Sequence, residues 1–349
     1  MVNILKKIIA YIVILINAIV GISNNSNNIF NYKYIKYNNV AINDNDASAI
    51  NCLNGYYVPG INMPDQQRYF KANIIRNINR DIERVTIGSS HMLTIRYEDD
   101  NIDHINLSVG GANLQDRLNI LGLLHFHNVK YKFVNFEIDI PSFTETAFII
   151  NKGYDFLSDY GDYFLKVLNG EDVSDFTYID YNKNYKNLYE NIGYNLYYKT
   201  KDKLNFYKLF YYDKEASQHI PEELNNGNDS WKENTVSSLA VSDQILKNMH
   251  INQKSVDVYN KIFKYFEDND VEVNIILIPR SPRIYDSENM NSFPIVNEIM
   301  EYAFNISKNK GVKITGSLNP HYINSKDEYY FDGLHFKQEV ANSIIDIRR

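Results

Sequence analysis

VTIGSSHML, residues 85–93, joins a short β-branched run to a glycine, two serines and a histidine. The run at 85–87 has the composition of a buried strand. Gly88 and the two serines after it are typical of a sharp turn at the end of a strand. Small hydroxyl residues in such a place can cap a following helix, or one of them can be a nucleophile. The rest of the chain has to separate these two interpretations.

Strand and helix patterns alternate on both sides of this stretch. They predict helices over 65–83, 113–126, 256–266, 295–306 and 336–347, and strands over 85–88, 104–111, 131–140, 271–279 and 312–315. This alternation is typical of the α/β class, with a parallel sheet between two layers of helices in a three-layer α/β/α arrangement. Ligands bind at the carboxyl ends of the strands in such sheets, and Ser90 lies at one of these ends.

The pattern is interrupted at about residues 150–250, which are dense in Tyr, Asn and Lys. Their weak periodicity predicts a large insertion packed over or beside the sheet. The tyrosines could stack on sugar rings, but half-buried packing is favoured because the whole chain is rich in Tyr, with 29 residues of this type.

The composition predicts one large domain, or a domain with a substantial insertion. The 349 residues are 44% hydrophobic, and the formal net charge is −7 with charges of both signs interspersed. No basic block indicates a nucleic-acid partner. Cys52 is the sole cysteine, so no disulfide can form within the chain.

The N-terminal segment, residues 1–24, predicts export. Lys6 and Lys7 precede a nearly unbroken apolar run at 8–22, which suits a signal peptide or a short signal anchor. An uncleaved anchor is favoured, because no clean small-x-small cleavage site follows the run. The two lysines would then be cytoplasmic, and the domain at 65–349 would lie outside the cell membrane after a linker at 25–64. If the segment is cleaved, the domain is secreted.

A second motif, YYFDGLHF at residues 329–336, carries an aspartate and a histidine three residues apart. A short loop can point both side chains at one site, where Asp332 orients the imidazole of His335 and stabilises its charged form. His335 could then take a proton from the Ser90 hydroxyl. Gly110 and Gly111, at the end of the second strand, free a backbone amide to face an oxyanion.

These blocks together resemble the SGNH hydrolases, the GDSL-like esterase superfamily. The resemblance covers roughly residues 65–347 without the insertion, and it implies a flavodoxin-like sheet. It assigns the nucleophile to Ser90, which follows the first strand in a Gly-Ser-Ser triplet. The Asp-x-x-His block before the last helix maps to Asp332 and His335. The oxyanion hole maps to the amides of Ser90 and Gly111.

One block departs from the family pattern. The family usually has Gly-x-Asn-Asp after the third strand, with the Asn side chain as an oxyanion donor, whereas this chain has FEIDIPSF. Asp139 falls near this fourth-block position, and an ionised carboxylate would repel an oxyanion. The site could use backbone donors alone, borrow Asn135 or Asn113, or be impaired. Losing one such donor typically costs about 10²–10³ in rate.

The Gly-Ser-Ser triplet and the N-terminal segment together are similar to a membrane-anchored branch of the family. That branch includes D-alanyl transfer proteins of teichoic acid synthesis and polysaccharide O-acetylation proteins. The resemblance implies an extracytoplasmic serine esterase or O-acyltransferase that acts on an envelope glycan or another acyl ester. Its partners would be an acylated carbohydrate or acyl donor, the membrane, and a membrane acyltransferase. The alternative is a degenerate domain that binds glycan or scaffolds an acyl-transfer complex.

Structural interpretations of the same residues remain beside these. The serines could form a helix cap alone, and Asp332 could belong to a plain turn with His335 in the core. His91 is interpreted as a neighbour of the nucleophile. His125 and His127 are two apart on a predicted helix and do not share a face, so we expect no metal site and no cofactor.

Overall fold

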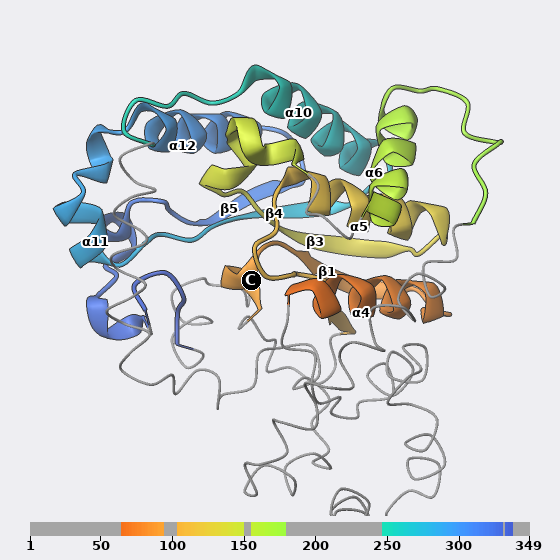
Figure 1. Ribbon diagram of the computed structural model, residues 1–349, viewed down its shortest axis with the longest axis horizontal. Helices are drawn as coiled ribbons and strands as arrows, with labels where there is room; N and C mark the ends of the chain where they lie inside the picture. The colour runs from red at the N-terminus through yellow and green to blue at the C-terminus, as the bar shows by residue number, and fades with distance from the viewer. Residues whose placement is uncertain (1–63, 94–102, 150–154, 179–245, 331, 338–349) are drawn as a thin grey trace, which may run out of the picture. The chain divides into compact units, whose positions relative to one another are not determined.

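A computed structural model describes residues 64–93, 103–149, 155–178, 246–330 and 332–337 (Figure 1). The expected membrane segment at 1–24, the linker, the larger part of the expected insertion and nearly all of the expected last helix lie outside these residues.

The centre of the domain is one five-stranded parallel sheet with the strand order β2-β1-β3-β4-β5. The strands are β1 (Ile82–Ile87), β2 (His104–Asn106), β3 (Tyr131–Glu137), β4 (Glu272–Leu277) and β5 (Val312–Gly316). The predicted α/β class with a parallel sheet is confirmed. All five carboxyl ends lie at the same edge because every pairing is parallel.

Helices alternate with the strands along the chain. They are α4 (Pro64–Asn77), α5 (Leu114–Phe126), α6 (Asp155–Leu168), α10 (Gln253–Asp268), α11 (Pro282–Ser287) and α12 (Pro294–Ile306). Figure 1 shows α5, α6, α10 and α12 together on one side of the sheet. Helix α4 lies beside the edge strand β2, where the Lys71 ammonium donates to the Asn106 carbonyl. The expected second layer of helices stays a prediction.

Helix α5 illustrates how the sequence sets the fold locally. Asn113 caps it by accepting from the Asp116 amide, and the Asp116 carboxylate accepts from the Asn113 amide in return. The helix is buried almost all round, because α6 covers the side that the sheet leaves open. The two helices approach so closely at Gly122 that a Cβ there would lie 2.0 Å from the Tyr160 carbonyl oxygen. Helix α6, which falls inside the expected insertion, is therefore part of the domain core.

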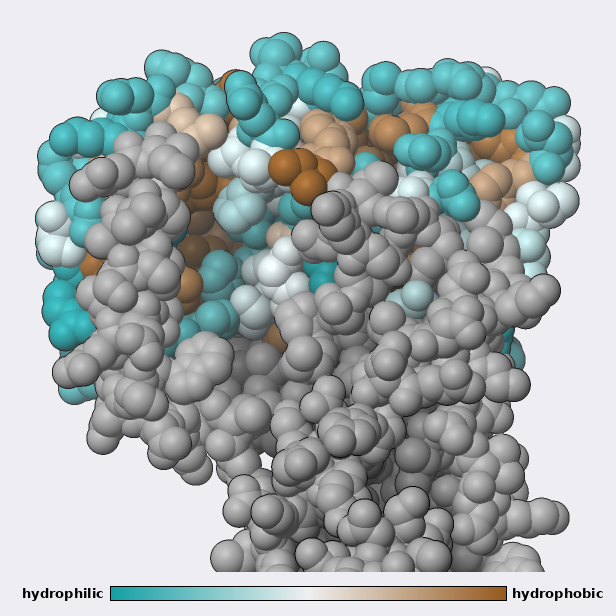
Figure 2. Space-filling view, viewed as in Figure 1, coloured by the Kyte–Doolittle hydropathy of each residue, from teal (hydrophilic) through white to brown (hydrophobic). Residues whose placement is uncertain are grey.

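The core and the surface are separated as in other α/β domains. One apolar cluster joins the sheet to the helices around it, and it includes Ile74, Leu118, Phe136, Phe164 and Tyr259. Figure 2 shows hydrophilic residues over most of the outer side of the described helices, with scattered apolar side chains between them. None of the helices in the described ranges has the length and apolarity needed to cross a membrane.

Candidate active site

The turn after β1 is shaped by a close approach to the end of β3. A Cβ added to Gly88 would lie 2.4 Å from Met92 Cγ and 2.7 Å from Glu137 Oε2, so a larger residue does not fit without movement. Ser89 then bonds to the same carboxylate: its amide donates to Oε2 and its hydroxyl donates to Oε1 at 3.1 Å. Glu137, on the neighbouring strand, thereby fixes where the first turn residues lie.

The two serines have different surroundings. Ser89 is buried and is the N-cap of a short 3-10 helix, η1 (Ser90–Met92), where its hydroxyl accepts from the His91 amide. Ser90 is half-buried and its hydroxyl faces a residue 245 positions later in the chain. The cap and the candidate nucleophile are therefore different residues of one turn.

The structure brings Ser90, His335 and Asp332 together in a hydrogen-bonded row. Ser90 Oγ lies 2.8 Å from His335 Nε2, and His335 Nδ1 lies 2.7 Å from Asp332 Oδ2. With Asp332 ionised, Nδ1 carries a proton towards the carboxylate, and Nε2 is free to accept from the serine hydroxyl. This arrangement can remove a proton from Ser90 and return it to another oxygen.

The Asp332 carboxylate is held ionised by its own loop. Its second oxygen accepts from the backbone amides of Leu334 and His335, each at 2.9 Å. Burial favours the neutral acid, but the His335 hydrogen bond and charge and the two amides outweigh it and lower the pKa of Asp332 to about 2. Gly333 makes the turn possible with a φ of 84°, and its carbonyl accepts from the Ser281 amide.

A small apolar cluster joins the turn that carries Ser90 to the loop that carries His335. Met92, two residues after Ser90, packs with Phe336, which directly follows His335. Ile276, Ile278 and Tyr330 complete the cluster. The serine and the histidine are therefore placed by buried neighbours as well as by their own hydrogen bond.

Two backbone amides beside Ser90 are available to a ligand. Beyond β2 the chain stays next to the β1 turn, because the Val109 amide donates to the Gly88 carbonyl. Gly111 follows in the left-handed region with a φ of 62°. Among the described residues, neither the Gly111 amide nor the Ser90 amide donates a hydrogen bond.

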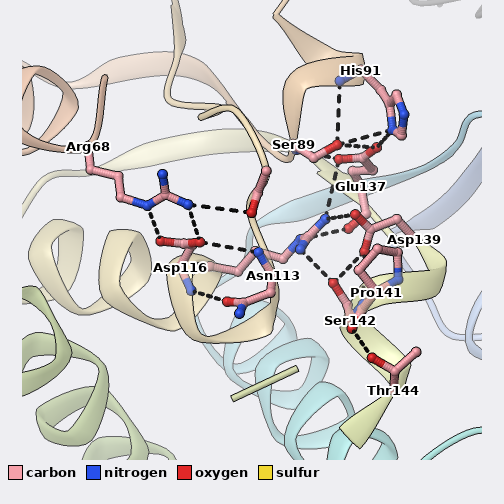
Figure 3. Close-up of polar contacts among 12 residues, drawn as sticks. Arg68, Ser89, His91, Asn113, Asp116, Glu137, Asp139, Pro141, Ser142 and Thr144 are labelled. Atoms are coloured by element: carbon pink, nitrogen blue, oxygen red, sulfur yellow. Dashed lines mark hydrogen bonds and ion pairs between the residues drawn. The ribbon is translucent and has the colours of Figure 1, made fainter. Parts of the chain in front are cut away.

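Helix α4 clamps the glycine turn that carries one of these amides. Gln67 accepts from the Gly110 amide at 2.7 Å, and the Arg68 guanidinium donates to the Gly110 and Gly111 carbonyls. Arg68 also makes a bidentate ion pair with Asp116 at the start of α5 (Figure 3). The clamp leaves the Gly111 amide without a hydrogen-bond acceptor within the described ranges.

Asp139, the residue at the fourth-block position, is buried and bound to partners of its own. Arg117 lies 3.0 Å from its Oδ2, and the Ser142 amide and hydroxyl donate to its Oδ1 (Figure 3). Burial and the nearby Glu137 charge raise the pKa of Asp139 against the opposite effects of Arg117 and Ser142. Because it accepts from the Ser142 amide, the Asp139 carboxylate is the N-cap of the 3-10 helix at 140–143.

Neither asparagine considered as a substitute donor is free for that role. The Asn113 side chain caps α5 and donates to the Thr146 and Ile149 carbonyls. Asn135 is buried within the sheet, where its amide donates to the Thr86 hydroxyl. Both side chains therefore complete local backbone and sheet contacts, which favours neither of them as an oxyanion donor.

A second histidine–carboxylate pair lies at the site, and no sequence pattern predicted it. His91 Nδ1 lies 3.0 Å from Glu137 Oε1 (Figure 3). The ring centroid of His91 lies 5.3 Å from that of His335. Arg117 also donates to Glu137, so the pair is part of a buried network that continues to Asp139. Glu137 had no distinguishing local signal, because it is one residue of an otherwise ordinary buried strand.

The other histidine pair belongs to the end of α5. His125 contacts the Tyr265 hydroxyl at 3.1 Å, and His127 is the C-cap residue. Burial lowers the pKa of each imidazole. No group of three or more His, Cys, Asp or Glu that could hold a metal ion occurs within the part of the chain that the structure describes.

The chain was compared with protein-family models, curated proteins and solved structures. Neither a protein-family model nor a curated protein matches the chain. One matching solved structure, from Streptococcus pneumonia, is described as that of a candidate platelet activating factor. It is 9% identical, with 80% of this chain and 88% of that chain covered and a TM-score of 0.38. A likeness this low carries no argument about function.

Proposed function

We propose that this chain is a serine esterase or O-acyltransferase of the SGNH type, which works through an acyl-Ser90 intermediate. The observation that carries the proposal is the contact of Ser90 Oγ with His335 Nε2, with Nδ1 of the same ring on Asp332. Ser90 and the loop that carries Asp332 and His335 are far apart in the sequence. They meet at the carboxyl edge of a parallel sheet, where ligands of such sheets bind.

The chemistry follows from these contacts. His335 Nε2 takes the hydroxyl proton while Ser90 Oγ attacks the ester carbonyl carbon, and the carbonyl oxygen gains the negative charge. The bond to the leaving alcohol then breaks, and the alcohol takes the proton from His335. In the second half, water or a sugar hydroxyl gives its proton to His335 and attacks the acyl group. Ser90 leaves with that proton restored.

The free amides of Ser90 and Gly111 are the proposed donors to the charged carbonyl oxygen. Such donors stabilise charge that develops in the transition state, because they are fixed before the reaction begins. The clamp of Gln67 and Arg68 on the glycine turn supports this role, since it holds the turn without occupying the Gly111 amide.

Labelling with a serine-directed phosphonate probe tests the nucleophile. Wild-type protein should take one label at Ser90, and Ser90→Ala should take none. Ser89→Ala is the matched control: it removes the hydroxyl of the capping residue and should still be labelled. Labelling of Ser90→Ala at the wild-type level would refute the proposal.

The proposal also includes a substrate class and a location of the domain relative to the cell membrane. An acylated envelope glycan and a membrane acyltransferase partner are suggested by the resemblance to anchored Gly-Ser-Ser proteins. An outward-facing domain is suggested by Lys6 and Lys7 before the apolar run. Protease added to intact spheroplasts should then digest the domain, and protection until lysis would contradict this topology.

The alternative of a degenerate binding domain was motivated by Asp139. Its ion pair with Arg117 and its bonds from Ser142 give this carboxylate a structural role, so it no longer argues against catalysis. Complementation separates the two functions: a binding domain would keep its cellular role in Ser90→Ala, whereas an enzyme would lose it.

A further inference from the structure

His91 lies at the reaction centre in a fixed orientation. Its Nδ1 is held by Glu137 Oε1 at 3.0 Å and lies 3.1 Å from the Ser89 hydroxyl, while its side chain remains partly exposed. Its ring is 5.3 Å from the ring of His335, whose Nε2 contacts Ser90. Within the described ranges Nε2 of His91 has no hydrogen-bond partner, so this nitrogen is available to a ligand.

The charge of the buried network indicates which form of His91 is present. Arg117 contributes one positive charge, and Glu137 and Asp139 contribute two negative charges. All three side chains are nearly inaccessible to water, and an unpaired charge in such a place is costly. A proton on His91 balances the cluster.

The electrostatics of the individual groups agree with this balance. Burial opposes a charged imidazole, but the hydrogen bond and charge of Glu137, with the charges of Asp139 and Asp332, raise the pKa of His91 above its ordinary value. Burial also opposes ionisation of Glu137, but its bonds to His91, Arg117 and the Ser89 amide lower its pKa. The proton therefore belongs to the imidazole, and Nε2 carries a hydrogen.

We infer that His91 is a further catalytic residue, whose Nε2–H donates to the substrate oxygen that becomes negative when Ser90 attacks. The sheet order supports this placement. Gly111 approaches Ser90 from the side of β2, and His91 is anchored to the last residue of β3 on the other side of β1. A neutral amide on one side of the nucleophile and a charged imidazole on the other suit a developing oxyanion.

A second cation does not prevent His335 from working. Each imidazole has its own carboxylate, with Asp332 on His335 and Glu137 on His91. Both rings can therefore be protonated in the transition state without an unpaired charge. The inference rests on the proposed function, because it needs an ester that reacts at Ser90.

Turnover of a small acetyl ester by the full chain tests this role, with His91→Leu and His91→Gln compared with wild type. His91→Leu should lower kcat by about 10²–10³-fold with a smaller change in KM, as for loss of one oxyanion donor. The control is His321→Leu, an exposed histidine that pairs with Asp286 and makes no hydrogen bond to Ser90, His335 or Asp332 among the described residues. It should leave kcat unchanged.

The pH profile distinguishes a catalytic donor from a structural residue. Wild-type kcat/KM should fall on the alkaline side as His91 loses its proton, and the raised pKa of His91 moves this decline above the ordinary histidine value. The charged and titratable groups around His91 are Glu137, Asp139, Arg117, Asp332 and His335. His91→Gln has an amide that does not titrate, so it should lack the alkaline decline. A structural role would instead lower activity equally at every pH.

The outcomes separate the two proposals. If wild type neither takes the phosphonate label nor turns over the ester, the proposed function fails and the role of His91 fails with it. If wild type is active and His91→Leu keeps kcat within about threefold, the proposed function stands and the role of His91 is refuted. Should His91→Leu fail to fold by circular dichroism, an unchanged alkaline decline in His91→Gln refutes it.

Discussion

Replacing Arg117 with methionine should destabilise the protein strongly, although Arg117 touches no part of the proposed substrate. The side chain is fully buried and donates to the Glu137 carbonyl, the Glu137 carboxylate and the Ser142 hydroxyl, and it pairs with Asp139 at 3.0 Å. Methionine fills a similar space but supplies no charge. The two buried carboxylates of Glu137 and Asp139 would then lose this cation, and Glu137 would keep His91 as a partner.

The magnitude follows from this loss of pairing. Removing one partner of a buried ion pair costs about 3–5 kcal/mol, because the remaining charge is left in a medium that solvates it poorly. A domain of this size loses slightly less than about 2 °C in melting temperature per kcal/mol, so Arg117→Met should melt roughly 5–8 °C below wild type. The pKa of Asp139 is raised even with Arg117 present, and it should rise further.

The sign of the pH dependence follows from that rise. A carboxyl whose folded pKa lies above its unfolded value stabilises the protein at low pH, and this contribution is lost as pH rises through the folded pKa. The free energy of unfolding that Arg117→Met loses relative to wild type should therefore be small near pH 4 and should grow towards pH 8. Urea titrations followed by circular dichroism at several pH values measure it.

A second substitution tests the cause. Asp139→Asn removes the surplus carboxylate, so Arg117→Met combined with Asp139→Asn should lose less stability than the sum of the two single changes. Lys264→Met, which breaks an exposed pair with Asp268, is the control and should leave the melting temperature unchanged. A loss below about 1 kcal/mol, or strictly additive single changes, would refute the charge argument.

Three further predictions concern the site directly. Asp332→Asn should keep the fold but lower kcat by about 10⁴-fold, because the His335 tautomer is no longer fixed; a loss below tenfold would contradict this. The lowered pKa of Asp332 stabilises the fold above pH 4, and this contribution should be lost as pH falls from roughly 4 to 2. Asp332→Asn should flatten that part of the stability curve, and an unchanged slope would refute the assignment. Gly88→Ala should cost about 1–3 kcal/mol and slow phosphonate labelling, since its Cβ would meet Met92 Cγ at 2.4 Å; wild-type stability would show that the turn can move.

The sequence by itself determined the strands of the sheet. It also determined those helix starts and turns that depend on neighbouring residues alone. The alternation of short β-branched runs with helical apolar periods predicted five strands, and all five lie in one parallel sheet. Asn113 and the glycines at 110 and 111 marked the start of α5 and the turn before it, because capping and left-handed backbone are local properties. The spacing of Asp332 and His335 likewise predicted a contact within one loop.

The tertiary structure decided what depends on contacts between distant segments. Helix α6 has an amphipathic pattern in a stretch dominated by Tyr and Asn, and its place against α5 follows from the close approach at Gly122. Glu137 lies 46 residues from His91 and 20 from Arg117, so no local pattern could show that these charges share one buried cluster. Ser89 and Ser90 are adjacent and alike in sequence. Their different surroundings arise because a strand end brings Glu137 to one hydroxyl and the last loop brings His335 to the other.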